Sequence, residues 1–263
     1  MQQVMTVLMR HRAWAIRLVA VLVITSLPLS ANAALLYNQN VTNNAIYGGG
    51  NPNGNFTVDR NSGVELGLRG KVTQTTNNGN GTYNTGLLSV WNFDFSVNTN
   101  WDGSSSFFID DLTYQLGIDY DEGLGTTYLA FDPITPNVAP LNAPFFDHSI
   151  GNNSTAQGAG AEAANAGTYL TLTSTNNLLQ QSWRHAFFQF LILGTVYNFT
   201  ENGNYEIYLK AFSGSTEIAS TNITVIAGAG APLPPAPEPS TCLMLLTGAC
   251  GMMVARRRKV AAC

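Results

Sequence analysis

Apolar and polar side chains alternate with a period of two along three stretches of the chain. Val64, Leu66 and Leu68 alternate with polar or small residues, and the same pattern recurs at 91–98 and 112–121. Successive side chains of a β-strand point to opposite faces of a sheet. The period therefore predicts strands that have one buried face and one solvated face.

Further strands are expected at 127–132, 168–174, 185–193, 205–213 and 217–226. The run 187–193 carries apolar residues on both faces, which favours a central place in a sheet. No amphipathic helix is expected, although the Ala-rich run 156–166 could hold a short one. The sequence thus predicts an all-β fold, a single antiparallel β-sandwich or jelly-roll-like domain of about eight to ten strands over residues 34–231.

Residues 1–33 have the features of a secretory signal peptide. A segment with three arginines precedes an apolar run at 18–27, and the small residues Ala31 and Ala33 follow at the positions that signal peptidase reads. Cleavage would leave Ala34 as the N-terminus of an exported protein. The alternative is an uncleaved anchor helix, but an apolar run of 10 residues is short for a bilayer.

The C-terminal segment, residues 232–263, combines three features. A Pro-rich spacer contains Pro237, Glu238 and Pro239, and its prolines keep it extended. An apolar run follows at 242–255. A basic cluster then closes the segment: Arg256, Arg257, Arg258 and Lys259.

Basic residues directly after an apolar span hold that end of the chain in the cytoplasm. A helix over residues 242–255 would be about 21 Å long, which is less than the roughly 30 Å hydrocarbon core of a bilayer. This short transmembrane helix therefore suits a temporary stop in the inner membrane better than a permanent anchor.

Together, these features resemble the PEP-CTERM sorting tail of Gram-negative, exopolysaccharide-producing bacteria, over residues 235–260. The resemblance implies recognition by exosortase, a membrane protease-transpeptidase that removes the tail and releases or transfers the protein to the outer surface. Pro237 and Pro239 would present Glu238 in an extended conformation, and the basic cluster would arrest translocation. The alternative is a permanently tail-anchored envelope protein. The domain before the tail resembles no characterised family.

Charge is distributed unevenly along the chain. Residues 34–231 carry five basic and 15 acidic side chains, a net charge of about −10. Such a domain repels nucleic acid and anionic lipid, so no nucleic-acid partner is expected. All three cysteines lie at 242–263, which leaves the domain without a disulfide framework or a thiolate metal site. No cofactor is expected.

Residues that could carry catalysis are sparse. Neither Gly-x-Ser-x-Gly nor His-Glu-x-x-His occurs. Asp147, His148 and His185 offer the possible His-based pairings. Neighbouring residues of a strand point to opposite faces, which favours a loop histidine and a strand histidine beside aromatic residues over a catalytic relay.

Two other groups could bind a ligand. Asp119, Asp121 and Glu122 are candidates for calcium, but the spacing of a complete calcium loop is absent, which favours solvated carboxylates at a strand end. Four aromatic residues outside clear alternation are candidates for a sugar-binding platform: Tyr83, Trp101, Tyr128 and Trp183.

The sequence predicts a non-enzymatic protein of the cell surface or extracellular matrix, with a structural, adhesive or carbohydrate-contacting role in exopolysaccharide or biofilm. The expected partners are signal peptidase, an exosortase-like membrane protease, the inner membrane transiently, and exopolysaccharide. The alternative is a secreted glycan-active hydrolase with a jelly-roll fold. Carboxylate pairs of the glycosidase type could occur among the 15 acids, but a sequence does not give their separation.

Overall fold

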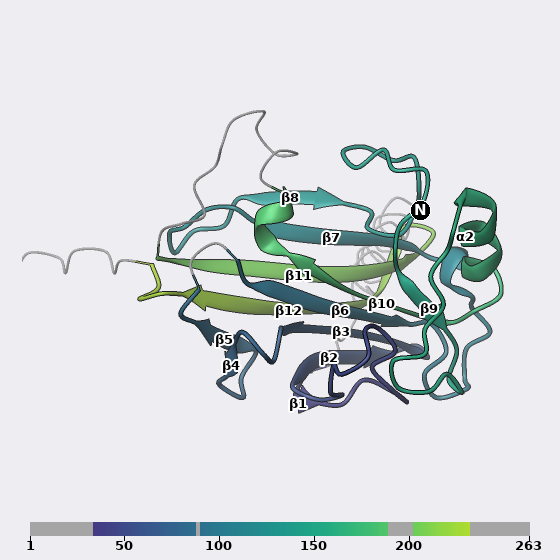
Figure 1. The fold of residues 1–263 in the computed structure, drawn as a ribbon, viewed down its shortest axis with the longest axis horizontal. Helices are drawn as coiled ribbons and strands as arrows, with labels where there is room; N and C mark the ends of the chain where they lie inside the picture. Colours follow the sequence, from purple (N-terminus) through teal and green to yellow (C-terminus); the bar gives the residue numbers. More distant parts are fainter. Residues whose placement is uncertain (1–33, 88–89, 189–201, 232–263) are drawn as a thin grey trace, which may run out of the picture. The chain divides into compact units, whose positions relative to one another are not determined.

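The structure, a computed structural model, describes residues 34–87, 90–188 and 202–231 (Figure 1). These residues form two six-stranded sheets, which we call sheet A and sheet B. Sheet A consists, in order, of β1 (Leu36–Gln39), β2 (Phe56–Asn61), β3 (Val64–Gly70), β6 (Asn92–Asn98), β10 (Leu178–Arg184) and β9 (Ser149–Gly151). Sheet B consists, in order, of β4 (Thr76–Asn77), β5 (Thr82–Thr85), β12 (Thr216–Ala227), β11 (Gly203–Ser213), β7 (Thr113–Asp119) and β8 (Tyr128–Phe131).

Helical structure in the described residues is limited to one α-helix, α2 (Ala166–Thr173), and two 3-10 turns, η1 (Ile109–Asp111) and η2 (His185–Phe188). α2 lies beside β9, at one end of the sheets (Figure 1). The strands of sheet A pair antiparallel throughout, whereas β5 and β12 of sheet B are parallel. The predicted β-rich class is therefore confirmed, but the expectation of purely antiparallel pairing is wrong for β5 and β12.

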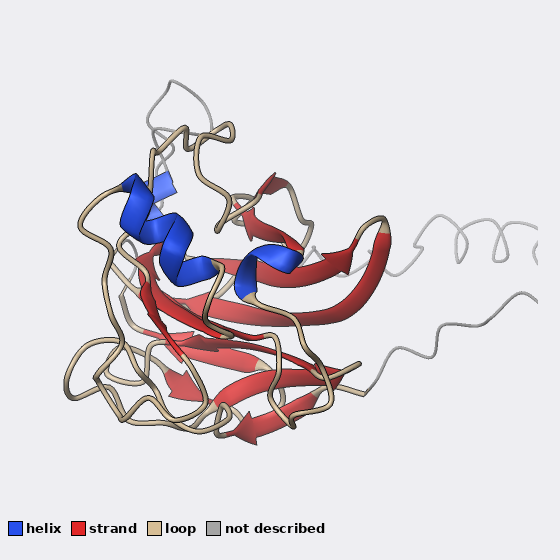
Figure 2. Ribbon diagram, turned by 90° about the vertical axis from the view of Figure 1, so that its right-hand side faces the viewer, coloured by secondary structure: helices blue, strands red, loops and turns tan. Residues whose placement is uncertain are grey.

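The strands lie in two layers (Figure 2). The inner faces of these layers share one hydrophobic core. Every second residue of the long strands is fully or almost fully buried, as the period of two predicts. Sheet A contributes Val64, Leu66, Leu68, Phe93, Phe95 and Val97. Sheet B contributes Leu116, Ile118, Ile207, Leu209, Ile223 and Val225. The predicted inward positions of β3, β6 and β7 are thus confirmed.

A buried carboxylate also links the two sheets. Asp59 of β2 in sheet A accepts a hydrogen bond from the backbone N–H of Ser220 of β12 in sheet B, at 2.7 Å. The neighbouring Thr57 carbonyl accepts from the Thr221 hydroxyl at 3.1 Å. Burial raises the pKa of Asp59. These bonds fix the position of β12 against β2, whereas the apolar contacts of the core have no directional preference.

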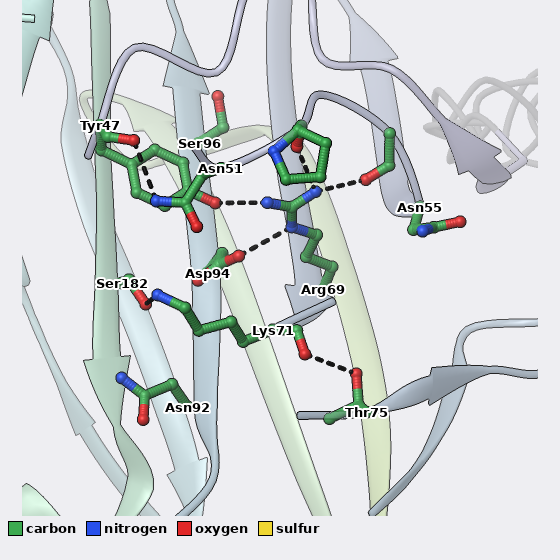
Figure 3. Close-up of polar contacts among 12 residues, drawn as sticks. Tyr47, Asn51, Asn55, Arg69, Lys71, Thr75, Asn92, Asp94, Ser96 and Ser182 are labelled. Carbon is green, nitrogen blue, oxygen red and sulfur yellow. Dashed lines mark hydrogen bonds and ion pairs between the residues drawn. The ribbon is translucent and has the colours of Figure 1, made fainter. Parts of the chain in front are cut away.

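The outer face of sheet A is polar and yet buried, because the loop 40–55 covers it. Arg69 of β3 and Asp94 of β6 are both fully buried, and the Arg69 Nε donates to Asp94 Oδ2 at 2.8 Å (Figure 3). The guanidinium also donates to three oxygens of the loop: the Tyr47 hydroxyl at 2.7 Å and the carbonyls of Pro52 at 2.9 Å and Gly54 at 2.6 Å. Arg69 therefore connects two strands and the covering loop.

Two more polar side chains of sheet A hold the same loop. Glu65 accepts from the backbone N–H and the hydroxyl of Thr42, both at 2.6 Å. Gln180 accepts from the N–H of Ile46 at 2.6 Å and donates to the carbonyl of Asn44 at 3.0 Å. The expectation of a solvated second face is therefore wrong for sheet A: buried polar residues on this face are Glu65, Arg69, Asp94, Ser96, Asn98 and Gln180.

The predicted strand at 168–174 is wrong, because these residues belong largely to α2. The Asn165 side chain accepts from the backbone N–H of Thr168 at 2.9 Å and so caps the first turn of the helix. Tyr169 and Thr173, four residues apart, are its buried residues. The predicted strand at 185–193 is also wrong over 185–188, which form η2, while 189–193 lie outside the described residues. The central position expected for 187–193 does not hold at Phe187, whose side chain is 61% exposed.

The predicted signal peptide and sorting tail, 1–33 and 232–263, lie outside the described residues. Among the residues that are described, no helix is both long enough and apolar enough to cross a membrane.

Replacing Arg69 with methionine should lower the free energy of unfolding by about 3–5 kcal/mol, because Asp94 and the loop oxygens would lose their buried partner. Urea denaturation of the purified protein, followed by tryptophan fluorescence, measures this change. The matched control is Arg184→Met in β10, which is exposed and should change stability by less than about 0.5 kcal/mol. Equal effects of the two substitutions would contradict the role assigned to Arg69.

Candidate functional site

The outer face of sheet B, unlike that of sheet A, carries half-buried side chains along its central strands. The strand register places Ala130, Gly117, Tyr208 and Asn222 in one row across β8, β7, β11 and β12. A Cβ atom at Gly117 would overlap the Tyr208 ring, so the ring lies directly over this glycine. Three strand spacings make the row about 14 Å long.

A second aromatic ring adjoins Tyr208 on this surface. The Tyr128 and Tyr208 ring centroids are 4.9 Å apart, in an edge-on arrangement. The Tyr128 hydroxyl donates to Glu206 Oε1 at 2.5 Å, and the Tyr208 hydroxyl lies 3.1 Å from Gln115 Oε1, to which it can donate. Burial, followed by the Glu206 carboxylate, raises the pKa of Tyr128. Both rings are thus neutral and held by bonds at their outer ends.

We call this surface the tyrosine face and define it by six residues: Gln115, Tyr128, Glu206, Tyr208, Lys210 and Asn222. Asn222 lies in the same row as Tyr208. Glu206 lies in the next row on one side, and Gln115 and Lys210 lie in the next row on the other side. Lys210 forms an ion pair with Glu217 at 2.8 Å, and its Nζ lies 5.6 Å from the centre of the Tyr208 ring. An aromatic ring surrounded by amide and carboxylate groups suits a ligand that has apolar C–H faces and many hydroxyls.

Of the four aromatic residues that the sequence suggested for sugar binding, Tyr128 belongs to the tyrosine face. Tyr83 is buried, with its hydroxyl donating to the Asn55 carbonyl at 2.6 Å. Trp183 is half-buried and packs against core rings, including Phe95 at 5.0 Å between centroids. Trp101 is half-buried, with the Arg60 guanidinium 4.8 Å from its ring centre.

Sequence reasoning missed the centre of this face, Tyr208 with Gly117. A signal for it exists in the two strand patterns. Gly117 interrupts the polar positions of the strand predicted at 112–121, and Tyr208 is an aromatic residue on the polar side of the strand predicted at 205–213. Cross-strand pairing, which a single sequence does not provide, is what brings them together.

The structure does not join Asp147 and His148 in a relay. The Asp147 carboxylate accepts from Gln181 Nε2 at 2.9 Å, whereas His148 Nδ1 lies 2.9 Å from the Tyr169 hydroxyl. Because that hydroxyl donates to the Ile134 carbonyl at 2.8 Å, His148 Nδ1 carries the proton. His148 Nε2 is buried without a hydrogen-bond partner among the described residues.

His185 is a buried residue of the core rather than a strand histidine. It begins η2, and its ring stacks on Trp91 with 4.3 Å between centroids. Its Nε2 lies 3.1 Å from the backbone carbonyl of Asp119. Burial lowers the pKa of both histidines, to about 3 for His148 and about 4 for His185.

The calcium candidates serve a turn. Asp119 is fully buried, and its Oδ1 accepts from the backbone N–H of Asp121 at 3.0 Å and of Thr127 at 2.8 Å. Asp121 in turn accepts from the N–H of Gly123 at 2.8 Å, and Glu122 is half-buried in the same turn. The expectation of a solvated carboxylate is therefore wrong for Asp119. In the described ranges, no group of three or more His, Cys, Asp or Glu residues could hold a metal ion.

Two other features have the outline of a site but less support. A cavity of about 290 Å³ lies beside α2, below the size of most ligand pockets, and is lined by Asp110, Leu112, Thr113, Ile134, Thr135, Pro136, Tyr169, Leu170 and Thr173. On sheet A, Lys71 Nζ donates to the Ser182 hydroxyl at 3.0 Å (Figure 3). Of the two side chains, only this contact is shown, and no group beside it completes a nucleophile and base arrangement in the described part of the chain.

The predicted sorting residues and the signal-cleavage residues lie outside the described part of the chain. Comparison of the chain with protein-family models, with curated proteins and with solved structures gave no match.

The protein should lose stability as the pH falls from about 6.5, because the unfolded histidines take up protons that the buried ones do not. For His148 this loss continues down to about pH 3. His148→Phe should reduce the slope of unfolding free energy against pH by about 1.4 kcal/mol per pH unit between pH 4 and 6.

The measurement is a series of urea titrations between pH 4 and pH 8, with pH 8 as the internal reference because histidine is neutral there in both states. The raised pKa values of Asp59 and Asp119 change stability in the opposite direction, because the folded carboxyls take up protons before the unfolded ones. This contribution is the same in wild type and His148→Phe, so it cancels when the two curves are subtracted. Parallel curves for wild type and His148→Phe would show that His148 does not set the acid limit.

Proposed function

We propose that this protein is an exported, non-enzymatic surface or matrix protein whose β domain contacts polysaccharide through the tyrosine face. The observation that carries the proposal is the Tyr208 ring held over Gly117 beside Tyr128. A ring fixed in this way loses little conformational freedom when a ligand packs on it. Export would deliver the domain to the medium in which such polysaccharides occur.

The polar groups of the tyrosine face support contact rather than turnover. Gln115 and Glu206 each accept a tyrosine hydroxyl, but the Gln115 amide nitrogen and the second Glu206 oxygen remain available to ligand hydroxyls. Asn222 lies next to Tyr208 across β11 and β12. The arrangement offers hydrogen-bond donors and acceptors around an aromatic ring, which is what contact with a polyhydroxylated ligand requires.

The delivery route in this proposal follows from the sequence. The 1–33 segment would be cleaved after Ala33, and an exosortase-like enzyme would act at Pro237-Glu238-Pro239 while Arg256–Lys259 held the short apolar helix in the inner membrane. The protein would then reach the surface of a Gram-negative bacterium. The shared core of sheets A and B supports a jelly-roll-like sandwich as the exported domain.

Sorting predicts a defined mass for the protein recovered from the cell surface and medium of its native host. The chain should begin at Ala34 and end close to residues 237–239, because both processing steps would be complete. Intact-mass spectrometry measures this. Glu238→Ala should leave residues 240–263 attached, whereas Pro232→Ala, in the same spacer but outside the motif, should be processed normally. A native protein that keeps its tail in the inner membrane would instead be permanently anchored.

Polysaccharide contact predicts that Tyr208→Ala weakens binding to polysaccharide from the native host by about tenfold or more, since it removes the central ring. Co-sedimentation of the purified chain with the insoluble polysaccharide measures the change. The matched control is Tyr37→Ala, which removes a 41% exposed tyrosine from β1 in sheet A. Equal binding by wild type and Tyr208→Ala would exclude the tyrosine face as the contact surface.

A further inference from the structure

We infer that the tyrosine face takes an uncharged polysaccharide, laid across the strands from β8 to β12, and discriminates against acidic polysaccharides. The inference rests on the proposed function and specifies the ligand of the same surface. It depends on three observations: the Tyr208 ring over Gly117 with the small, exposed Ala130 next in the row, the charges around the ring, and the charge of the whole domain.

The shape of the face gives the direction of the ligand. Ala130 and Gly117 precede Tyr208 in the row across the sheet, and neither has a side chain beyond a methyl group. Tyr128 and Glu206 lie on one side of this row, and Gln115 and Lys210 lie on the other. The Tyr208 ring itself covers Gly117, whereas Ala130 is exposed. A chain that crosses the strands can therefore pack on the ring and on Ala130 while polar side chains reach its edges.

The charges on the face do not form a site for an anion. Lys210 is its one cation, and this ammonium already pairs with Glu217 at 2.8 Å. Glu206 adds a half-buried carboxylate beside Tyr208, and one of its oxygens accepts the Tyr128 hydroxyl. A uronate or sulfate group placed on this surface would approach Glu206 without a free cation to balance it, which costs free energy.

The domain as a whole adds to this discrimination. Residues 34–231 contain 15 acidic and five basic side chains. Of these basic side chains, Arg69 is fully buried against Asp94, and Arg60 is paired with Glu65 at 2.7 Å. The long-range field therefore repels a polyanion at low ionic strength, and hydroxyl groups of a neutral chain are unaffected by it.

The test compares neutral and acidic polysaccharides with the purified full chain. The neutral probes are a β-linked glucan and a galactomannan, and the acidic probe is alginate, a polyuronate. Binding is measured by affinity electrophoresis or calorimetry at about 50 mM and about 500 mM NaCl. The higher salt concentration screens interactions between exposed charges, so the difference shows how much of the binding is electrostatic. We expect binding to a neutral probe that changes less than about twofold with salt, and alginate binding at least about tenfold weaker at low salt.

Two variants tie this binding to the surface. Tyr208→Ala removes the ring, and Gly117→Ala keeps the tyrosine but displaces its ring from the sheet. Each should weaken binding to the neutral probe about tenfold, while Tyr37→Ala should not. Urea midpoints show whether each variant is folded. If Gly117→Ala does not fold, Tyr208→Ala alone provides the test, because it only removes atoms from a half-buried position.

The results distinguish a wrong ligand class from a failure of polysaccharide contact itself. If alginate binds as well as or better than the neutral probes, and Tyr208→Ala abolishes that binding, the inference is wrong and the polysaccharide-contact function stands. If no probe and no host polysaccharide binds in a Tyr208-dependent manner, the proposed function fails, and the inference fails with it.

Discussion

The buried guanidinium of Arg69 is the interaction on which the architecture of sheet A depends. A cation in a protein interior is tolerated only when its charge is balanced and its donors are satisfied. Asp94 supplies the charge, and Tyr47, Pro52 and Gly54 supply the remaining acceptors from the loop 40–55. The loop therefore cannot leave the sheet without exposing a charge pair that was desolvated on folding, and it remains part of the folded unit.

This constraint makes the two sheets unlike one another. The loop 40–55 covers the polar face of sheet A through Arg69, Glu65 and Gln180, so those side chains are used within the molecule. Among the described residues, sheet B has no comparable buried ion pair, and its outer positions along β11 and β12 are half-buried. The open face is consequently the one where aromatic and amide side chains can meet a ligand, while the covered face provides rigidity behind it.

The sequence was informative where one physical rule dominates. The alternation at Val64, Leu66 and Leu68, like that of β6, β7, β11 and β12, reports burial against a common core, and these strands form where the pattern predicts them. It was misleading where local and tertiary effects compete. The Asn165 cap turns a β-like run into α2, and β10 was missed because Gln180 is polar and yet buried.

The candidate site shows the same limit. Tyr128 was recognisable as a platform residue, but its neighbour Tyr208 lies 80 positions away in the sequence and meets it only through the pairing of β7 with β8 and β11. Likewise, no pattern in the sequence predicts that the loop 40–55 covers Arg69. Register between distant strands is therefore the information that the sequence alone lacked.

The place of β12 in sheet B has a consequence for the order of folding. This strand, Thr216–Ala227, is the last one described along the chain, yet it lies inside the sheet, parallel to β5 and antiparallel to β11. Pairing between such distant segments carries a large loop-closure cost and is slow. If the chain crosses the membrane N-terminus first, β4 and β5 cannot join β11, β7 and β8 in one sheet until residue 227 has emerged. That residue lies only a few positions before the Pro-rich spacer. In the sorting route that we propose, a pause in translocation at residues 232–263 would keep the chain tethered while its final strand inserts, so that the protease would meet a completed domain.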